Sequence, residues 1–83
     1  ARLMAEKGYG DFYIMTFLEG LGVPEDMAVS AVDKVSKDLT EEERISMLTK
    51  KRKGLSREKM IRFLAGKGLA YEKILSVLGG EDQ

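Results

Sequence analysis

An internal repeat constrains the fold of this chain more than any other feature of its sequence. When the sequence is shifted by 46 residues, KGYGDFYIMTFLEGLGV (residues 7–23) falls on KGLSREKMIRFLAGKGL (residues 53–69), since 53 − 7 = 46. The identical pairs are Lys7 and Lys53, Gly8 and Gly54, Phe17 and Phe63, Leu18 and Leu64, Gly20 and Gly66, Gly22 and Gly68, and Ser30 and Ser76. A period of this length is typical of arrays of helical units. We therefore expect two copies of one helical unit.

The apolar residues of both units recur at the spacing of a helix. In the first unit these residues are Ile14, Phe17, Leu18 and Leu21, and in the second they are Met60, Ile61 and Leu64. No useful length alternates apolar and polar residues, so no strand is expected. The predicted fold class is all-α, with tandem three-helix repeats of which the first is truncated at its N-terminal helix. The predicted division is a truncated middle repeat over 1–35, a joint over 36–40, a C-terminal three-helix repeat over 41–79 and a tail over 80–83.

Capping residues predict where the helices begin. Asp11 and Ser56 are suited to the N-cap position, and Pro24 is suited to the first position of a helix. Thr40 and Glu43 have the spacing of a capping box, which predicts a helix start at that point. A last short helix is expected over residues 71–78.

The stretch AGKGLA (65–70) has a lysine between two glycines, and two interpretations compete for it. Glycine-rich loops with a lysine bind phosphates, but glycine is also the residue that most often ends a helix. The repeated copy of this stretch is EGLGVP, in which Leu21 replaces Lys67 while both glycines are kept. The stretch also lacks the spacing of a GxxxxGK[ST] loop. We therefore interpret these glycines as helix caps.

The composition excludes several classes of function. The 83 residues include no cysteine and no histidine, which removes disulfides, thiol chemistry, the usual zinc sites and histidine acid–base catalysis. No nucleophile–base pair or metal-ligand set is evident, so we expect no enzyme activity, no cofactor, no metal and no small-molecule substrate. No apolar run approaches the length of a membrane span, so we expect a cytoplasmic protein without a membrane partner.

The charge is divided unevenly between the two halves of the chain. Residues 1–42 contain four basic and nine acidic side chains (4 − 9 = −5), and residues 43–83 contain ten basic and five acidic side chains (10 − 5 = +5). Between positions 50 and 67 the only acid is Glu58. The eight basic residues of this run, which we predict to bind nucleic acid or a protein–DNA filament, are Lys50, Lys51, Arg52, Lys53, Arg57, Lys59, Arg62 and Lys67.

A purely structural explanation accounts for half of this run. Residues 50–53 fall at the end of a predicted helix, where the negative end of its dipole stabilises each cation by about 0.3–1 kcal/mol. Arg57, Lys59 and Arg62 fall at the start of the following helix, where cations oppose the dipole. We interpret this second group as a binding surface.

Aromatic residues are the other candidates for contact with nucleic acid, because bases stack on their rings. Phe17 and Phe63 occupy equivalent repeat positions beside core leucines, so we expect both to be in the core. Phe12 and Tyr13 are adjacent, so we expect one of them at the surface. Tyr71, near a predicted helix start, fits either the core or the surface.

Both repeated segments resemble the RecX family of recombination regulators. KGYGDFYIMTFLEGLGVPEDMAVSAVDKV and KRKGLSREKMIRFLAGKGLAYEKILSVL follow that family's pattern of a basic stretch, Lys-Gly, an amphipathic helix, a glycine turn and a third helix ending in apolar residues. The resemblance implies three-helix repeats that bind in the groove of a RecA–single-stranded DNA filament. It further implies inhibition of RecA's ATP hydrolysis, strand exchange and coprotease activity, and therefore a role in recombination, DNA repair and the SOS response.

One segment departs from the family's pattern. Family members commonly have basic side chains on the middle helix of the first matching unit, whereas DFYIMTFLE (11–19) has no lysine or arginine. Two alternatives therefore stay open beside RecA regulation. One is a generic helical protein-interaction module, and the other is a direct binder of single- or double-stranded DNA with helix-turn-helix character.

Overall fold

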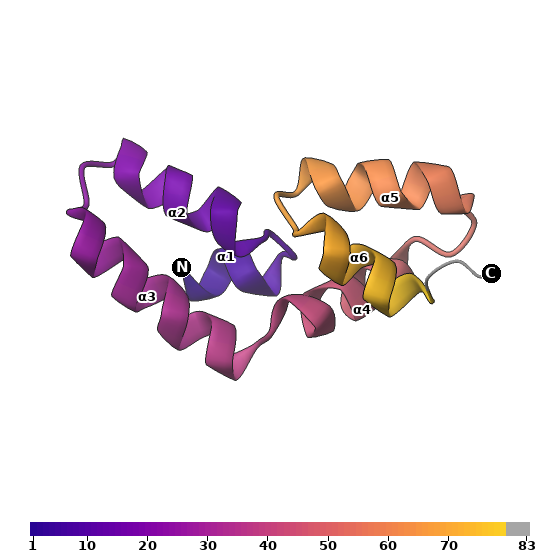
Figure 1. Cartoon of the computed structure of the whole chain (residues 1–83), viewed down its shortest axis with the longest axis horizontal. Helices are drawn as coiled ribbons and strands as arrows, with labels where there is room; N and C mark the ends of the chain where they lie inside the picture. The colour runs from indigo at the N-terminus through magenta and orange to yellow at the C-terminus, as the bar shows by residue number, and fades with distance from the viewer. Residues whose placement is uncertain (80–83) are drawn as a thin grey trace.

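The computed structural model describes residues 1–79, and all of their regular structure is helical (Figure 1). The predicted all-α fold class is therefore confirmed. The helices of this part of the chain are α1 (Arg2–Glu6), α2 (Asp11–Gly20), α3 (Glu25–Asp38), α4 (Glu41–Lys51), α5 (Arg57–Gly66) and α6 (Tyr71–Leu78). The predicted tail, residues 80–83, lies outside the described residues.

The helix starts follow the same shift as the sequence. α2 begins at residue 11 and α5 at residue 57, and α3 begins at residue 25 and α6 at residue 71, so both pairs differ by 46. The glycines between the helices also agree, because Gly8 and Gly54 have φ of 93° and 135° and Gly22 and Gly68 have φ of 88° and 83°. Only glycine adopts such positive φ values without strain, which explains why both copies contain it there.

Each set of three helices has its own hydrophobic core, and the two sets lie end to end (Figure 1). The first core contains Ala5, Ile14, Val32 and Val35 from α1, α2 and α3. The second core, from α4, α5, α6 and the turn before α6, contains Ile45, Leu48, Met60, Leu64, Leu69 and Ile74. The molecule is accordingly elongated, with extents of 41 × 20 × 18 Å.

The capping predictions have mixed outcomes. Thr40 and Glu43 form the predicted capping box, and the Ser56 hydroxyl accepts a hydrogen bond from the Lys59 N–H as expected. Asp11 is not the N-cap of α2: Gly10 occupies that position, and Asp11 is the first helical residue. Pro24 is the N-cap of α3 and not its first residue.

The predicted joint is shorter in the structure, because α3 continues through residues 36–38. Only Leu39 and Thr40 separate α3 from α4. Leu39 packs against the first core, so the helix has an apolar contact up to its end.

The prediction that Phe17 lies in the core is wrong, since its ring is 47% exposed. Ile14 and Leu18 fill the face of α2 that packs on the first core, which leaves Phe17 on the outer side. Phe63, its counterpart in the second unit, packs against the second core as expected. Phe12 and Tyr13 are both exposed, at 76% and 40%.

Two glycine-containing turns, one from each half, contact each other. The Gly10 N–H donates a hydrogen bond of 2.8 Å to the carbonyl oxygen of Lys67. A Cβ atom on Gly10 would collide with the backbone of Gly68, and one on Gly68 would lie 2.6 Å from the Cβ of Tyr13. Gly68 of AGKGLA is therefore more than a helix cap, because it allows the second half to approach the first.

We predict that Gly10→Ala lowers the free energy of unfolding by about 1–3 kcal/mol, because the added methyl group forces the two turns apart. Gly20→Ala is the matched control: a Cβ there meets nothing within 4 Å, and alanine favours the helix by up to about 1 kcal/mol. Urea unfolding followed by circular dichroism measures both values. Equal stability of the two variants would contradict the close approach.

Candidate functional site

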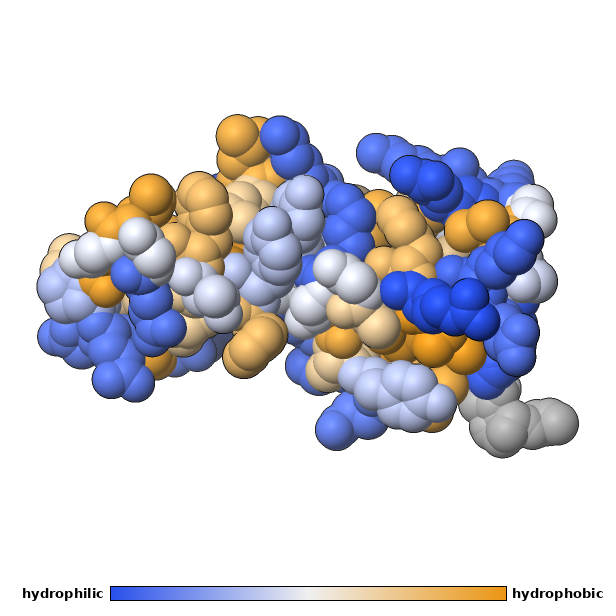
Figure 2. All heavy atoms as spheres, turned by 90° about the horizontal axis from the view of Figure 1, so that it is seen from above, coloured by the Kyte–Doolittle hydropathy of each residue, from blue (hydrophilic) through white to orange (hydrophobic). Residues whose placement is uncertain are grey.

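An open hollow of about 450 Å³ lies where the two halves meet, and we call it the aromatic hollow. Its lining residues are Tyr9, Tyr13, Phe63, Gly66 and Lys67. They come from the turn before α2, from α2 itself and from the C-terminal end of α5. Figure 2 looks down on α2 and α5: hydrophilic residues predominate over the α5 half, and apolar residues are more frequent over the α2 half.

Three rings and two cations form a continuous series of contacts across the hollow, which we call the aromatic–cation row: Tyr13, Tyr9, Lys67, Phe63 and Arg52. The rings of Tyr13 and Tyr9 stack with centroids 4.5 Å apart and planes 17° apart. Lys67 Nζ lies 4.3 Å from the centroid of Tyr9 and 5.7 Å from that of Phe63. Arg52 Cζ lies 4.5 Å from the centroid of Phe63. The row therefore extends from α2 to the end of α4.

Arg52 and Lys67, two members of the predicted basic run, thus lie over aromatic rings. Lys59 and Arg62 are exposed on α5, where Lys59 precedes Phe63 by four residues and Arg62 follows Lys59 by three. Residues three and four apart lie on the same side of a helix. Lys59 and Arg62 therefore place positive charge on the part of α5 that precedes the hollow.

The rest of the predicted basic run lies elsewhere on the surface. Lys50 lines a second open hollow of about 400 Å³, together with Glu42 and Glu43 of the same helix. Lys51, Lys53 and Arg57 are exposed around the turn between α4 and α5 and do not line the aromatic hollow. The structure therefore brings four of the eight residues to the hollow or to the helix face beside it. Binding by any of the eight stays a prediction.

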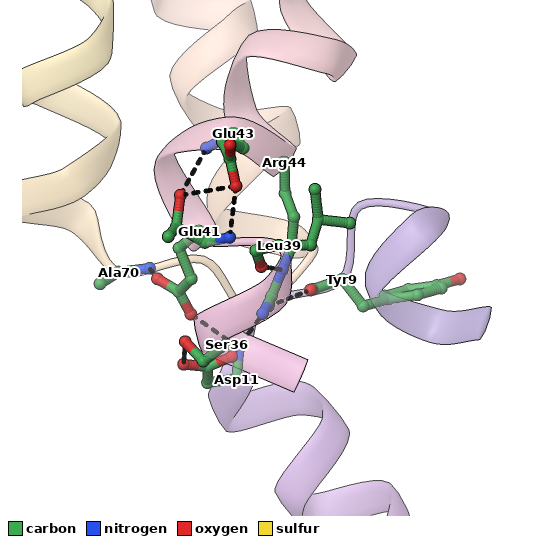
Figure 3. A network of polar contacts seen from close by, with 9 residues as sticks. Tyr9, Asp11, Ser36, Leu39, Glu41, Glu43, Arg44 and Ala70 are labelled. Atoms are coloured by element: carbon green, nitrogen blue, oxygen red, sulfur yellow. Dashed lines mark hydrogen bonds and ion pairs between the residues drawn. The ribbon is translucent and has the colours of Figure 1, made fainter. Parts of the chain in front are cut away.

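One buried carboxylate joins the starts of α2, α4 and α6 (Figure 3). Glu41, at the start of α4, is 4% exposed. Its Oε2 accepts a hydrogen bond of 2.7 Å from the N–H of Asp11, and its Oε1 accepts one of 3.2 Å from the N–H of Ala70. Those N–H groups belong to the starts of α2 and α6. The carboxylate therefore lies near the positive dipole ends of three helices, where negative charge is stabilised.

A buried arginine fixes the turn that carries Tyr9. Arg44 is 0% exposed, and its Nη1 donates a hydrogen bond of 2.9 Å to the carbonyl oxygen of Tyr9. Its Nε donates one of 3.0 Å to the carbonyl oxygen of Leu39. Nη1 also lies 2.8 Å from Asp11 Oδ1, as an ion pair without hydrogen-bond alignment. The other oxygen of Asp11 accepts a hydrogen bond from Ser36. Asp11 therefore joins α2 to α3 and α4.

Three residues of this region were not predicted from the sequence: Tyr9, Glu41 and Arg44. Glu41 and Arg44 lie on the same face of α4 as the buried Ile45 and Leu48, at positions 41, 44, 45 and 48. Charged residues at core spacing are the signal that would have indicated a buried network. Tyr9 offered no such signal, since its contact with Lys67 depends on how the two halves pack.

An aromatic ring of the row can contact either a cation or a nucleobase. A cation over an exposed ring contributes about 0.5–1 kcal/mol. A nucleobase stacked on a protein aromatic ring contributes about 1–3 kcal/mol. A base that enters the hollow therefore meets rings on which it can stack and cations that can pair with its phosphate.

Two further kinds of feature are metal-binding clusters and membrane-spanning helices, and neither is found in the part of the chain that the structure describes. Within residues 1–79 no group of three or more Asp, Glu, His or Cys side chains is arranged to hold a metal ion. None of the helices in that range combines the length and the apolar character needed to cross a membrane.

No protein-family model matches the chain, and comparisons with curated proteins and with solved structures give no match either. The interpretation of the site therefore depends on its own residues and geometry.

We predict that Glu41→Gln lowers the free energy of unfolding by about 1–3 kcal/mol, because its amide NH₂ would face one of the two N–H donors that the carboxylate now satisfies. Glu42→Gln, which removes the same charge from an exposed neighbour, should cost less than about 1 kcal/mol. Urea unfolding of both variants measures the difference. A loss of equal size in the two would show that Glu41 does not hold the helix starts together.

Proposed function

We propose that this chain is a RecX-like regulator that binds the RecA–single-stranded DNA filament and inhibits its ATP hydrolysis, strand exchange and coprotease activity. The observation that carries the proposal is the resemblance of both repeated segments to that family's repeats. On this proposal the chain acts in the cytoplasm, has no enzyme activity and needs no cofactor.

The exposed charge on α5 supports the proposal. Lys59 and Arg62 are exposed, and within residues 1–79 the structure gives neither of them an ion pair. Both positive charges are therefore available to an anionic partner. A RecA filament supplies one through the phosphates of its DNA or the acidic residues of its protein surface, and clustered basic side chains bind polyanions by releasing counterions.

The two repeats differ at these positions. Subtracting 46 from 59 and 62 gives 13 and 16, which are Tyr13 and Thr16 in the first unit. The basic contact is therefore a property of the second unit, and the first unit has an aromatic ring and a hydroxyl at the equivalent places. On this proposal the second half of the chain supplies the electrostatic attraction to the anionic partner.

A generic protein-interaction module is the second candidate, because the first three helices expose large apolar side chains. Phe12, Leu21 and Met27 are 76%, 66% and 60% exposed. Exposed apolar patches often mark contacts with other proteins. Binding through this surface would not depend on the charges of α5.

We predict that the double variant Lys59→Glu/Arg62→Glu needs a concentration about ten-fold higher or more than the unmodified chain to inhibit RecA's DNA-dependent ATP hydrolysis, because charge reversal repels phosphate. The control is Lys34→Glu/Lys37→Glu, which changes the same number of exposed charges on α3. Steady-state ATP hydrolysis at fixed RecA and DNA concentrations measures both.

The control variant should inhibit as the unmodified chain does. Absence of inhibition by the unmodified chain would overturn the proposed function. Equal inhibition by both double variants would overturn the role of α5 and favour the protein-interaction module.

A further inference from the structure

We infer that the aromatic hollow binds an unstacked base of single-stranded DNA, with Tyr13 as the stacking platform and Lys67 as the contact for a neighbouring phosphate. This inference deepens the proposed function and rests on it for the identity of the natural strand. It adds a direct contact with DNA bases at a defined place on the chain.

Tyr13 has the geometry of a platform. One face of its ring stacks on Tyr9, and the side chain is still 40% exposed. The ring of Tyr9 supports one face of the Tyr13 ring. The backbone of Tyr9 is itself held in place, because its carbonyl oxygen accepts a hydrogen bond from the buried Arg44. A base that stacks on Tyr13 extends an existing stack and does not require the protein to rearrange.

The cations in the row favour a nucleic acid over an apolar peptide. Lys67 lies between the rings of Tyr9 and Phe63, and Arg52 lies over Phe63. An apolar segment in the hollow would bury these charges without a partner, which is unfavourable. A nucleotide brings a π surface for the Tyr13 ring and a phosphate for the nearby ammonium group of Lys67, so it satisfies both.

The position of the rings favours a single strand over a duplex. Tyr13 and Phe63 line the open hollow, and a base can stack on such a ring only when one of its own faces is free of a neighbouring base. The bases of a duplex are stacked and paired, whereas those of a single strand are available to aromatic side chains. Lys59 and Arg62 are exposed on α5, each four residues before a residue that lines the hollow (Phe63 and Gly66), so the backbone of such a strand could follow this side of the helix.

The test compares two strands that carry the same charge. One is an oligothymidine of about 12 nucleotides, and the other is an abasic strand of the same length, which keeps the phosphates and lacks the bases. The 83-residue chain has no tryptophan and three tyrosines, two of them in the row, so quenching of tyrosine fluorescence reports on binding. We expect the oligothymidine to bind about ten-fold more tightly than the abasic strand.

The variants separate stacking from charge. Tyr13→Leu should bring the affinity for oligothymidine down about ten-fold, to that for the abasic strand, and Tyr13→Phe should keep the wild-type difference. Phe12→Leu is the matched control, since it removes an exposed ring from the adjacent position of α2 outside the hollow. Because Tyr13→Leu and Tyr13→Phe change the tyrosine signal, the affinities of all variants are also measured by anisotropy of labelled strands. Circular dichroism confirms that each variant is folded.

Two results would overturn the inference: equal affinity of the unmodified chain for both strands, and equal losses in Tyr13→Leu and Phe12→Leu. Failure of the proposed function looks different. If the chain binds bases through Tyr13 but does not slow RecA's ATP hydrolysis, the RecA role fails and the base site stands. If it slows ATP hydrolysis but shows no preference for bases, the base site fails and the RecA role stands.

Discussion

The buried carboxylate of Glu41 is the contact on which the arrangement of the two halves depends. It accepts hydrogen bonds from the first residue of α2 and from the residue that precedes α6, while it belongs to the first turn of α4. These backbone groups have no partner within their own helices, because the first N–H groups of a helix never do. One side chain therefore satisfies donors from both halves of the chain. Replacement of the carboxylate by an amide leaves one of these part-buried donors without an acceptor at the place where the halves meet.

The candidate site follows from this arrangement. With α2 and α6 fixed at their starts, the turn before α2 comes close to the turn after α5, and the Gly10 N–H bonds to the Lys67 carbonyl. Small residues are required there, because a side chain on Gly10 would collide with Gly68. The same approach brings Tyr9 within 4.3 Å of the Lys67 ammonium group. The aromatic hollow is thus formed by the junction of the two units, and neither unit contains it alone.

Much of the local structure was predictable from the sequence, and the junction was not. Hydrophobic spacing, the Thr40–Glu43 box and the glycine turns predicted helices whose starts differ by the same 46 residues as the sequence repeat, because these signals act over a few residues. Phe17 was placed wrongly, since the repeat equates it with Phe63 although only Phe63 packs against a core. The contact between Tyr9 and Lys67 joins residues 58 positions apart (67 − 9 = 58), and no local pattern encodes it.

The central claim is that the junction places an aromatic platform beside cations so that it receives a base. Nuclear magnetic resonance of the chain bound to oligothymidine tests this claim most directly. Our account predicts nuclear Overhauser contacts between the ring protons of Tyr13 and the methyl protons of thymine, together with the largest shift changes at Tyr13, Gly66 and Lys67. Shift changes confined to the exposed residues of α5, without any contact between Tyr13 and thymine, would show that the chain binds phosphates alone and would contradict it.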